Sequence, residues 1–219
     1  MEKGKIVVIR HGERKSLGTG KTWENRAGLT AGCKTWETMA GLTNNGLVQT
    51  RDFAIRYGDL LKNCKIFATS PLVCAQETLY KVMETLVVSV NEYDKIIYSQ
   101  DLWTHHPAEY MSGDSSFTAA ALATANPRLA NEDGQIALRF IGDIGIRMGK
   151  SSEKVALLIS HGGPIDFLYV ALRMRLEPIV ASRDFGECEG MVITVKFEGS
   201  KIVLDSIEEI RNPTSDDAT

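Results

Sequence analysis

The sequence has little cysteine and no paired cysteine motif, which argues against a disulfide framework and against common metal sites. Its four cysteines, Cys33, Cys64, Cys74 and Cys188, form no CxxC pair and no Cys/His spacing typical of metal ligands. We therefore expect reduced thiols, a cytoplasmic location and no metal site.

The sequence also lacks a strong charge of either sign and lacks long apolar runs. A formal net charge of −3 over 219 residues gives no global basic field to hold nucleic acid or an anionic membrane. No apolar run is long enough to span a bilayer, and the run before Arg10 is too short for a signal peptide. Since 43% of the residues are hydrophobic and 24% charged, we expect one folded domain over 1–219 with a flexible tail over 212–219.

Short apolar, β-branched runs alternate with stretches of helical character along the chain. The runs predict strands at 5–9, 65–69, 95–98, 155–159 and 191–197, and a hairpin strand at 202–204. Helices are predicted over 44–61, 71–86, 135–148 and 163–174, the second with Ser70 as its N-cap and Pro71 as its first residue. This alternation predicts an α/β fold with three αβα layers, in which helices flank a mainly parallel central sheet.

Residues 15–42 separate the first strand from the first helix and contain an internal duplication. KTWENRAGLT at 21–30 returns as KTWETMAGLT at 34–43, with eight of ten positions identical. Two copies are too few for a solenoid, so we expect an irregular inserted loop near the ligand-binding end of the sheet. It is either a tandem duplication on the surface or a flap that pairs Trp23 with Trp36.

Two histidines follow two of the predicted strands directly. His11 stands in Arg10-His11-Gly12-Glu13, and His161 is followed by Gly162 at the start of a predicted helix. The carboxyl ends of parallel strands lie at one edge of a sheet, and a helix N-terminus attracts anions. We therefore expect Arg10, His11 and His161 to share one anion, with the two imidazoles within roughly 8 Å of each other.

Four segments, in this order along the chain, resemble the motifs of the histidine phosphatase superfamily, which includes the phosphoglycerate mutases. They are the RHG of 10–12, the LTxxG of 42–46, a relative of SPLxRAxQT at 70–78 and the SHGG of 160–163. The resemblance implies a phosphoglycerate mutase-like fold and hydrolysis of phosphomonoesters without metal or cofactor. It assigns His11 as the nucleophile that becomes phosphohistidine.

The same resemblance assigns the groups around the phosphate. Arg10 would bind phosphate oxygens through its fork of donors, and Gly162 would line the phosphate site. His161 would stabilise the charge on the transferring group.

The sequence departs from the superfamily at two positions. Cys74 stands where the third motif has a second phosphate-binding arginine. Thr104 stands where related enzymes often have an acidic proton donor, which leaves Asp101 and Glu109 as the candidate acids.

Several alternatives stay open around these departures. Arg14 either supplies the missing charge or is a solvated loop residue. Cys74 is either a reactive thiol or an inert one. The pair His105-His106 either lies on a surface loop or gives one contact to substrate.

Three functions follow, in order of preference. The first is a phosphomonoester hydrolase, with low activity if the phosphate clamp is incomplete. The second is a weak or inactive relative that binds phosphorylated ligands or protein partners, and the third is a phosphoglycerate mutase. The expected partner is a phosphorylated small molecule or a phosphoprotein, and the sequence leaves both a monomer and a homodimer open.

Overall fold

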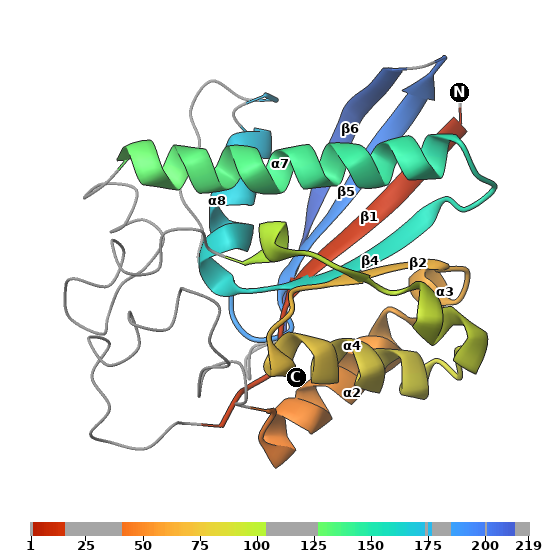
Figure 1. Ribbon diagram of the computed structural model, residues 1–219, viewed down its shortest axis with the longest axis vertical. Coiled ribbons are helices and arrows are strands. Elements are labelled where there is room, and N and C mark those ends of the chain that lie inside the picture. Colours follow the sequence, from red (N-terminus) through yellow and green to blue (C-terminus); the bar gives the residue numbers. More distant parts are fainter. Residues whose placement is uncertain are drawn as a thin grey trace, which may run out of the picture.

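The computed structural model describes residues 2–15, 41–103, 127–173, 175–176, 185–199 and 201–212. Within these ranges one six-stranded sheet lies between two layers of helices (Figure 1). The strands are β1 (Glu2–Arg10), β2 (Ile66–Thr69), β3 (Ile97–Tyr98), β4 (Val155–Ser160), β5 (Gly190–Glu198) and β6 (Lys201–Ile210). The helices are α2 (Asn44–Arg56), α3 (Gly58–Leu61), α4 (Val73–Thr85), α7 (Pro127–Gly149) and α8 (Gly162–Arg173), with short 3-10 helices η1 (Val90–Lys95) and η2 (Gln100–Leu102).

The sheet is mixed, so the mainly parallel sheet expected from the sequence is matched only in part. In the order β3-β2-β4-β1-β5-β6, the first four strands run parallel, whereas β5 runs antiparallel to β1 and β6 antiparallel to β5. The tight turn at Gly199, which has a φ of 63°, joins β5 directly to β6 and so requires an antiparallel pair. The hairpin was predicted, but β6 is longer than the predicted 202–204.

Each face of the central strand β1 packs on one helical layer. Ile6 and Val8 belong to the core beneath α7 and α8, whereas Val7 and Ile9 belong to the core beneath α2 and α4. All four side chains are fully buried, and each contributes about 1.5–3 kcal/mol relative to exposure. Because both faces of β1 are covered, its sequence is a continuous apolar run rather than an alternating one.

Two helices begin elsewhere than predicted. Helix α4 starts at Val73 with Leu72 as its N-cap residue, so Pro71 and Ser70 lie before the helix. Helix α7 starts at Pro127, eight residues before the predicted start. A side chain at Gly145 of α7 would lie 3.0 Å from Ile202 of β6, so close packing on the sheet explains this glycine in mid-helix.

Among the described helices, none combines the length and the apolar character needed to cross a membrane.

Candidate active site

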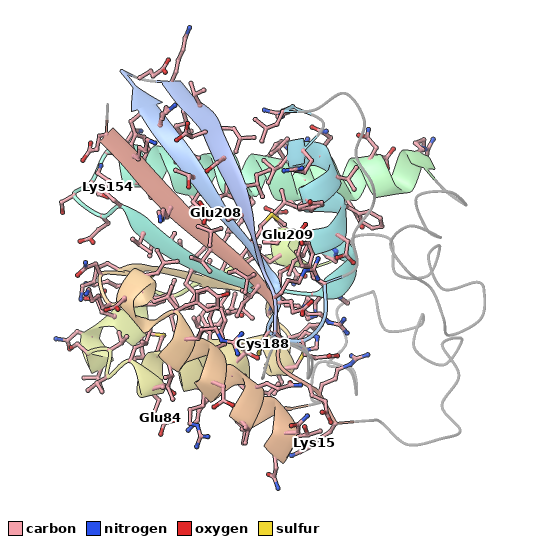
Figure 2. The ribbon with its side chains drawn as sticks, turned by 180° about the vertical axis from the view of Figure 1, so that it is seen from behind. Lys15, Glu84, Lys154, Cys188, Glu208 and Glu209 are labelled. Atoms are coloured by element: carbon pink, nitrogen blue, oxygen red, sulfur yellow. The ribbon has the colours of Figure 1, made fainter. Side chains whose placement is uncertain are left out.

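The carboxyl ends of β1, β4 and β2 meet, and each is followed by a polar residue. The backbone N–H of His11 donates to the Ser160 carbonyl at 3.0 Å, and that of Ser70 donates to the Ile159 carbonyl at 3.0 Å. The rings of His11 and His161 face each other edge to face, with centroids 5.0 Å apart. The expected approach of the two imidazoles is therefore confirmed. Figure 2 shows Cys188 at this end of the sheet and Lys154 at the opposite end.

The His11 imidazole is held in one tautomer by its own neighbour. Its Nδ1 lies 2.7 Å from the carbonyl oxygen of Gly12, and since a carbonyl only accepts, Nδ1 carries the proton. The lone pair is therefore on Nε2. Burial lowers the pKa of His11 to about 4, the Gly12 hydrogen bond opposes this, and the charges of Arg10 and Arg14 lower it further. At neutral pH the free site thus holds a neutral imidazole, the form that can act as a nucleophile.

His161 is held by Ser70, a residue that was expected to be the N-cap of helix α4. The Nε2 of His161 and the Oγ of Ser70 lie 2.8 Å apart, and the same Oγ accepts from the Leu72 N–H at 3.2 Å. Ser70 therefore orients a pocket histidine instead of capping α4, which corrects its predicted role. Burial, together with the charges of His11, Arg14 and Arg10, lowers the pKa of His161 well below its usual value.

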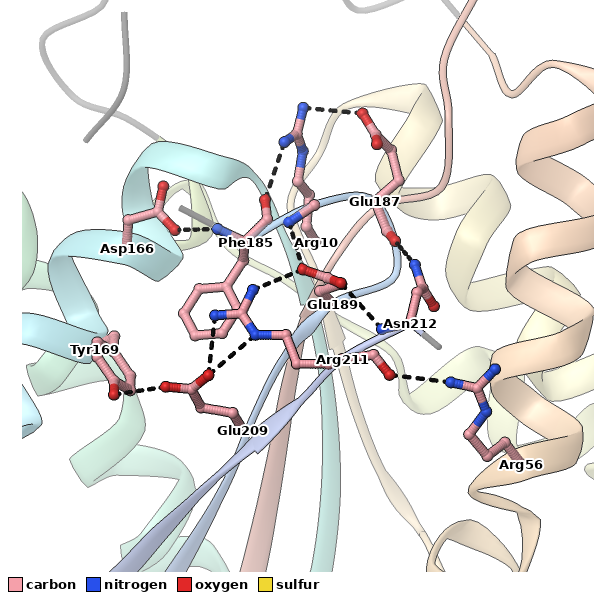
Figure 3. Close-up of polar contacts among 11 residues, drawn as sticks. Arg10, Arg56, Asp166, Tyr169, Phe185, Glu187, Glu189, Glu209, Arg211 and Asn212 are labelled. Carbon is pink, nitrogen blue, oxygen red and sulfur yellow. Dashed lines mark hydrogen bonds and ion pairs between the residues drawn. The ribbon is translucent and has the colours of Figure 1, made fainter. Parts of the chain in front are cut away.

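Arg10 lies beside the N-terminus of α8, and among the described residues not all of its N–H groups have a hydrogen-bond partner. Its Nη1 donates to the Phe185 carbonyl at 3.0 Å, and its Nη2 pairs with Glu187 at 3.2 Å (Figure 3). Its Nε is buried without a hydrogen-bond partner among the described residues. A side chain at Gly162 would lie 3.5 Å from Nη1, so the guanidinium packs directly on the first turn of α8. The unpartnered Nε–H and this helix end suit an anion.

The segment before β5 positions these partners of Arg10. Glu189 accepts from the Gly186 N–H at 2.9 Å, from the Asn212 N–H at 3.0 Å and from Arg211 at 2.7 Å (Figure 3). At the other end, the Phe185 N–H donates to Asp166 at 2.9 Å. No sequence motif marks this segment, because its partners come from α8 and from beyond β6.

The glycines of the first two motifs let the loop after β1 approach helix α2. A side chain at Gly46 would overlap the carbonyl oxygen of Glu13, and one at Gly12 would lie 2.6 Å from the carbonyl oxygen of Gly46. Thr43 caps α2 by accepting from the Gly46 N–H at 2.9 Å. Both motifs therefore hold the backbone beside His11 in place.

Cys74 lies in the first turn of α4, fully buried, beside both histidines. It packs with Leu42, Leu72 and Trp103, and its Sγ belongs to a set of three donor atoms with one nitrogen each of His11 and His161. These three atoms all lie within 4.8 Å of one another. Burial raises the pKa of Cys74 to about 11, although the charge of Arg14 opposes this. The free thiol is thus protonated at neutral pH, which disfavours the reactive alternative.

Arg14 is exposed, yet its charge acts on both histidines and on Cys74. It lowers the pKa of His11, of His161 and of Cys74. Its backbone forms an antiparallel bridge with Leu42, and the Lys15 N–H donates to the Gly41 carbonyl at 2.9 Å. The two ends of the 15–42 insertion therefore meet beside the pocket, outside the main sheet.

Of the two candidate acids, only Asp101 lies among the described residues. Asp101 lies in η2, where the next residue, Leu102, accepts through its carbonyl from the Ser160 hydroxyl at 2.6 Å. The end of η2 thus reaches the pocket. Glu109, Thr104 and the pair 105–106 lie outside the described residues, as do Trp23, Trp36 and the tail over 213–219.

The lowered pKa of His11 predicts a loss of stability in mild acid. Between pH 6.5 and about 4 the unfolded chain binds a proton at this histidine and the folded chain does not. Stability therefore rises with pH through this window, by roughly 3 kcal/mol for His11. Urea unfolding at pH 7, 5 and 4 measures the change, and we expect a shallower dependence in His11→Gln. The same dependence in both proteins would assign the effect to other groups.

Comparison of the sequence with models of protein families finds no match, and comparison with curated proteins finds none either. Comparison with solved structures finds similar chains. A mycobacterial hydrolase is similar at 15% identity and a TM-score of 0.58, over 94% of this chain and 98% of that chain. The mycobacterial glucosyl-3-phosphoglycerate phosphatase in complex with VO3 is similar at 17% identity and a TM-score of 0.54, over 92% and 97%. The chain therefore shares the fold of these two mycobacterial enzymes. The likeness extends over nearly its whole length.

Proposed function

We propose that this chain is a phosphomonoester hydrolase that works through a phosphohistidine on His11. One observation carries the proposal: a neutral His11 with a free Nε2 faces His161 beside Arg10, at the ends of adjacent strands. A phosphomonoester would bind with its oxygens toward Arg10, the first turn of α8 at Gly162 and His161.

The reaction takes two steps. In the first, Nε2 of His11 attacks phosphorus in line, the N–P bond forms, and the P–O bond to the leaving group breaks. The leaving oxygen takes a proton from Asp101 or Glu109. In the second step water attacks phosphorus and passes a proton to the same carboxylate, while the N–P bond breaks, which returns the lone pair to Nε2 of His11 and releases phosphate. His161 and the arginines stabilise the charge of the phosphoryl oxygens in both steps.

Arg14 belongs to this proposal as the second cation of the clamp. The side chain of Cys74 is neutral, whereas the charge of Arg14 already acts on both histidines. Because Arg14 is exposed, it holds phosphate less firmly than a buried guanidinium would.

The substrate class is a phosphorylated small molecule or a phosphoprotein. The mycobacterial phosphatase of the same fold was solved with VO3 and also with inorganic phosphate. These anions are therefore the first probes for this pocket. The free, buried Cys64, Cys74 and Cys188 support a cytoplasmic location as part of the proposal.

A catalytically weak phosphate-binding protein is the second candidate, and Cys74 is the observation that favours it. Turnover of p-nitrophenyl phosphate in the presence of a chelator, together with its inhibition by vanadate, separates the two candidates. We expect turnover and micromolar-to-millimolar inhibition. Phosphate binding without turnover would favour the second candidate, and neither binding nor turnover would reject both. Transfer of phosphate between the positions of a phosphoglycerate would instead support the mutase.

Replacing Cys74 with arginine should raise kcat/KM for a simple phosphate ester by about tenfold or more, which corresponds to ~1.4 kcal/mol. The first turn of α4 would direct a permanent charge and a bidentate donor toward the phosphoryl oxygens. Steady-state kinetics of the wild type and Cys74→Arg check this, with Cys74→Gln as an uncharged control and Tm as a check of folding, since a larger side chain strains a packed site. A fall in kcat/KM in a folded Cys74→Arg would contradict this expectation and show that Arg10 and Arg14 already form a complete clamp.

A further inference from the structure

The pocket also holds a thiol, that of Cys74, which phosphate hydrolysis does not explain. His11, Cys74 and His161 come from the end of β1, the first turn of α4 and the end of β4, and their three donor atoms lie within 4.8 Å of one another. Two imidazoles and a thiolate form a ligand set that suits zinc and similar cations, with one position left open.

The geometry needs only a small closure to bind such an ion. At bond lengths of about 2.0–2.3 Å, the ligand atoms of a tetrahedral zinc site lie roughly 3.3–3.7 Å apart. Side-chain rotations that bring the donor atoms closer by up to about 1.5 Å are thus sufficient. The hydrogen bond from Nδ1 of His11 to the Gly12 carbonyl at 2.7 Å is the outer contact typical of a metal-bound histidine, and it leaves Nε2 for the ion.

The charged groups around these three residues also affect how well a cation would bind. Arg10 and Arg14 both act on the histidines and oppose binding. The thiolate formed at Cys74 would cancel one positive charge of the ion. The arginine that the superfamily motif has at position 74 would instead repel the ion and offer no donor atom, so the metal site depends on the departure at Cys74.

We infer that His11, Cys74 and His161 form a three-ligand site for a zinc-like divalent cation, which competes with phosphate esters for the pocket. On binding, the metal–sulfur bond replaces the thiol S–H bond and the proton leaves to water. The ion also takes the Nε2 lone pair of His11, so His11 cannot attack phosphorus. The inhibitory consequence rests on the proposed phosphatase function, but the metal site itself does not.

Spectroscopic titration with Co²⁺ tests the site. In the full-length, reduced and phosphate-free chain we expect one equivalent of Co²⁺ to give a thiolate-to-cobalt charge-transfer band and the intense visible bands of a four-coordinate ion. Zn²⁺ should abolish both. Cys74→Ser should remove the charge-transfer band and weaken binding at least a hundredfold, since loss of even an outer contact costs about 10–100-fold.

Cys64→Ser is the matched control. Cys64 is a buried cysteine whose Sγ donates to the Ile66 carbonyl at 3.3 Å, a contact that serine can keep, and this variant should retain the band. His161→Gln, measured with Tm, gives a second variant in case Cys74→Ser does not fold. A wild type without the band, or a band that persists in Cys74→Ser or depends on Cys33, would overturn the inference.

An activity assay separates this inference from the proposed function. With p-nitrophenyl phosphate we expect turnover in a chelator. After the chelator is removed, we expect stoichiometric Zn²⁺ to inhibit turnover and higher concentrations of the ester to weaken that inhibition. Turnover without the cobalt band would refute the metal site and keep the phosphatase. The cobalt band without turnover in chelator would refute the phosphatase and keep the metal site.

Discussion

His11→Ala is expected to lower kcat/KM for p-nitrophenyl phosphate by at least about 10⁴-fold. The substitution removes the only atom that the proposed mechanism uses to form a bond to phosphorus. Arg10, Arg14 and His161 remain, so phosphate should still bind, and the loss should appear mainly in kcat. Steady-state kinetics measure the rate, and isothermal titration with phosphate measures the binding.

Lys62→Ala is a suitable control, because Lys62 lies on the surface at the end of α3 and pairs only with Asp59 among the described residues. It should keep full activity. If His11→Ala retained more than a small fraction of the wild-type rate while folded, another residue would have to be the nucleophile.

Arg14→Ala should lower kcat/KM by about 10²-fold, at the lower end of the effect of removing a charged transition-state donor, because Arg14 is exposed. In the Arg14→Ala background, Cys74→Arg should restore tenfold or more, and by a larger factor than in the wild type. This non-additivity is expected because both guanidiniums serve the same phosphoryl oxygens. A double-mutant cycle in kcat/KM measures it.

Lys15→Ala is the matched control for this cycle, since Lys15 is the neighbouring exposed cation. It should change kcat/KM by less than threefold. Equal losses in Arg14→Ala and Lys15→Ala would show a general field effect and contradict a specific role for Arg14.

The layers of the fold could be predicted because they depend on local patterns. The apolar run at β1 has both faces buried, and Thr43 caps α2 as its position suggests. The direction of β5 could not be predicted in this way, because it depends on the path of the chain after α8. The N-cap preference of serine also gave a wrong prediction at Ser70, because its side chain contacts His161, far along the chain, instead of capping the helix.

The candidate site also divides into parts that local patterns predict and parts that depend on long-range contacts. His11 and His161 could be placed together because each follows a strand, and strand ends meet at one sheet edge. The contacts of Arg10 with Phe185 and Glu187 could not, because no motif marks that segment. The third motif already indicated that Cys74 lies at the phosphate site, but no metal-ligand spacing marks its grouping with the two histidines, since the three residues come from separate elements.

Isolation of the phosphorylated protein tests the central claim most directly. The full-length chain is mixed with p-nitrophenyl phosphate in a chelator and quenched within milliseconds in alkali, in which phosphohistidine survives. Peptide mass spectrometry then locates the modification. We predict one phosphoryl group on His11, lost on acid treatment and absent from His11→Ala. Phosphate on Cys74 or on another residue, or rapid turnover with no phosphorylated protein, would contradict the account.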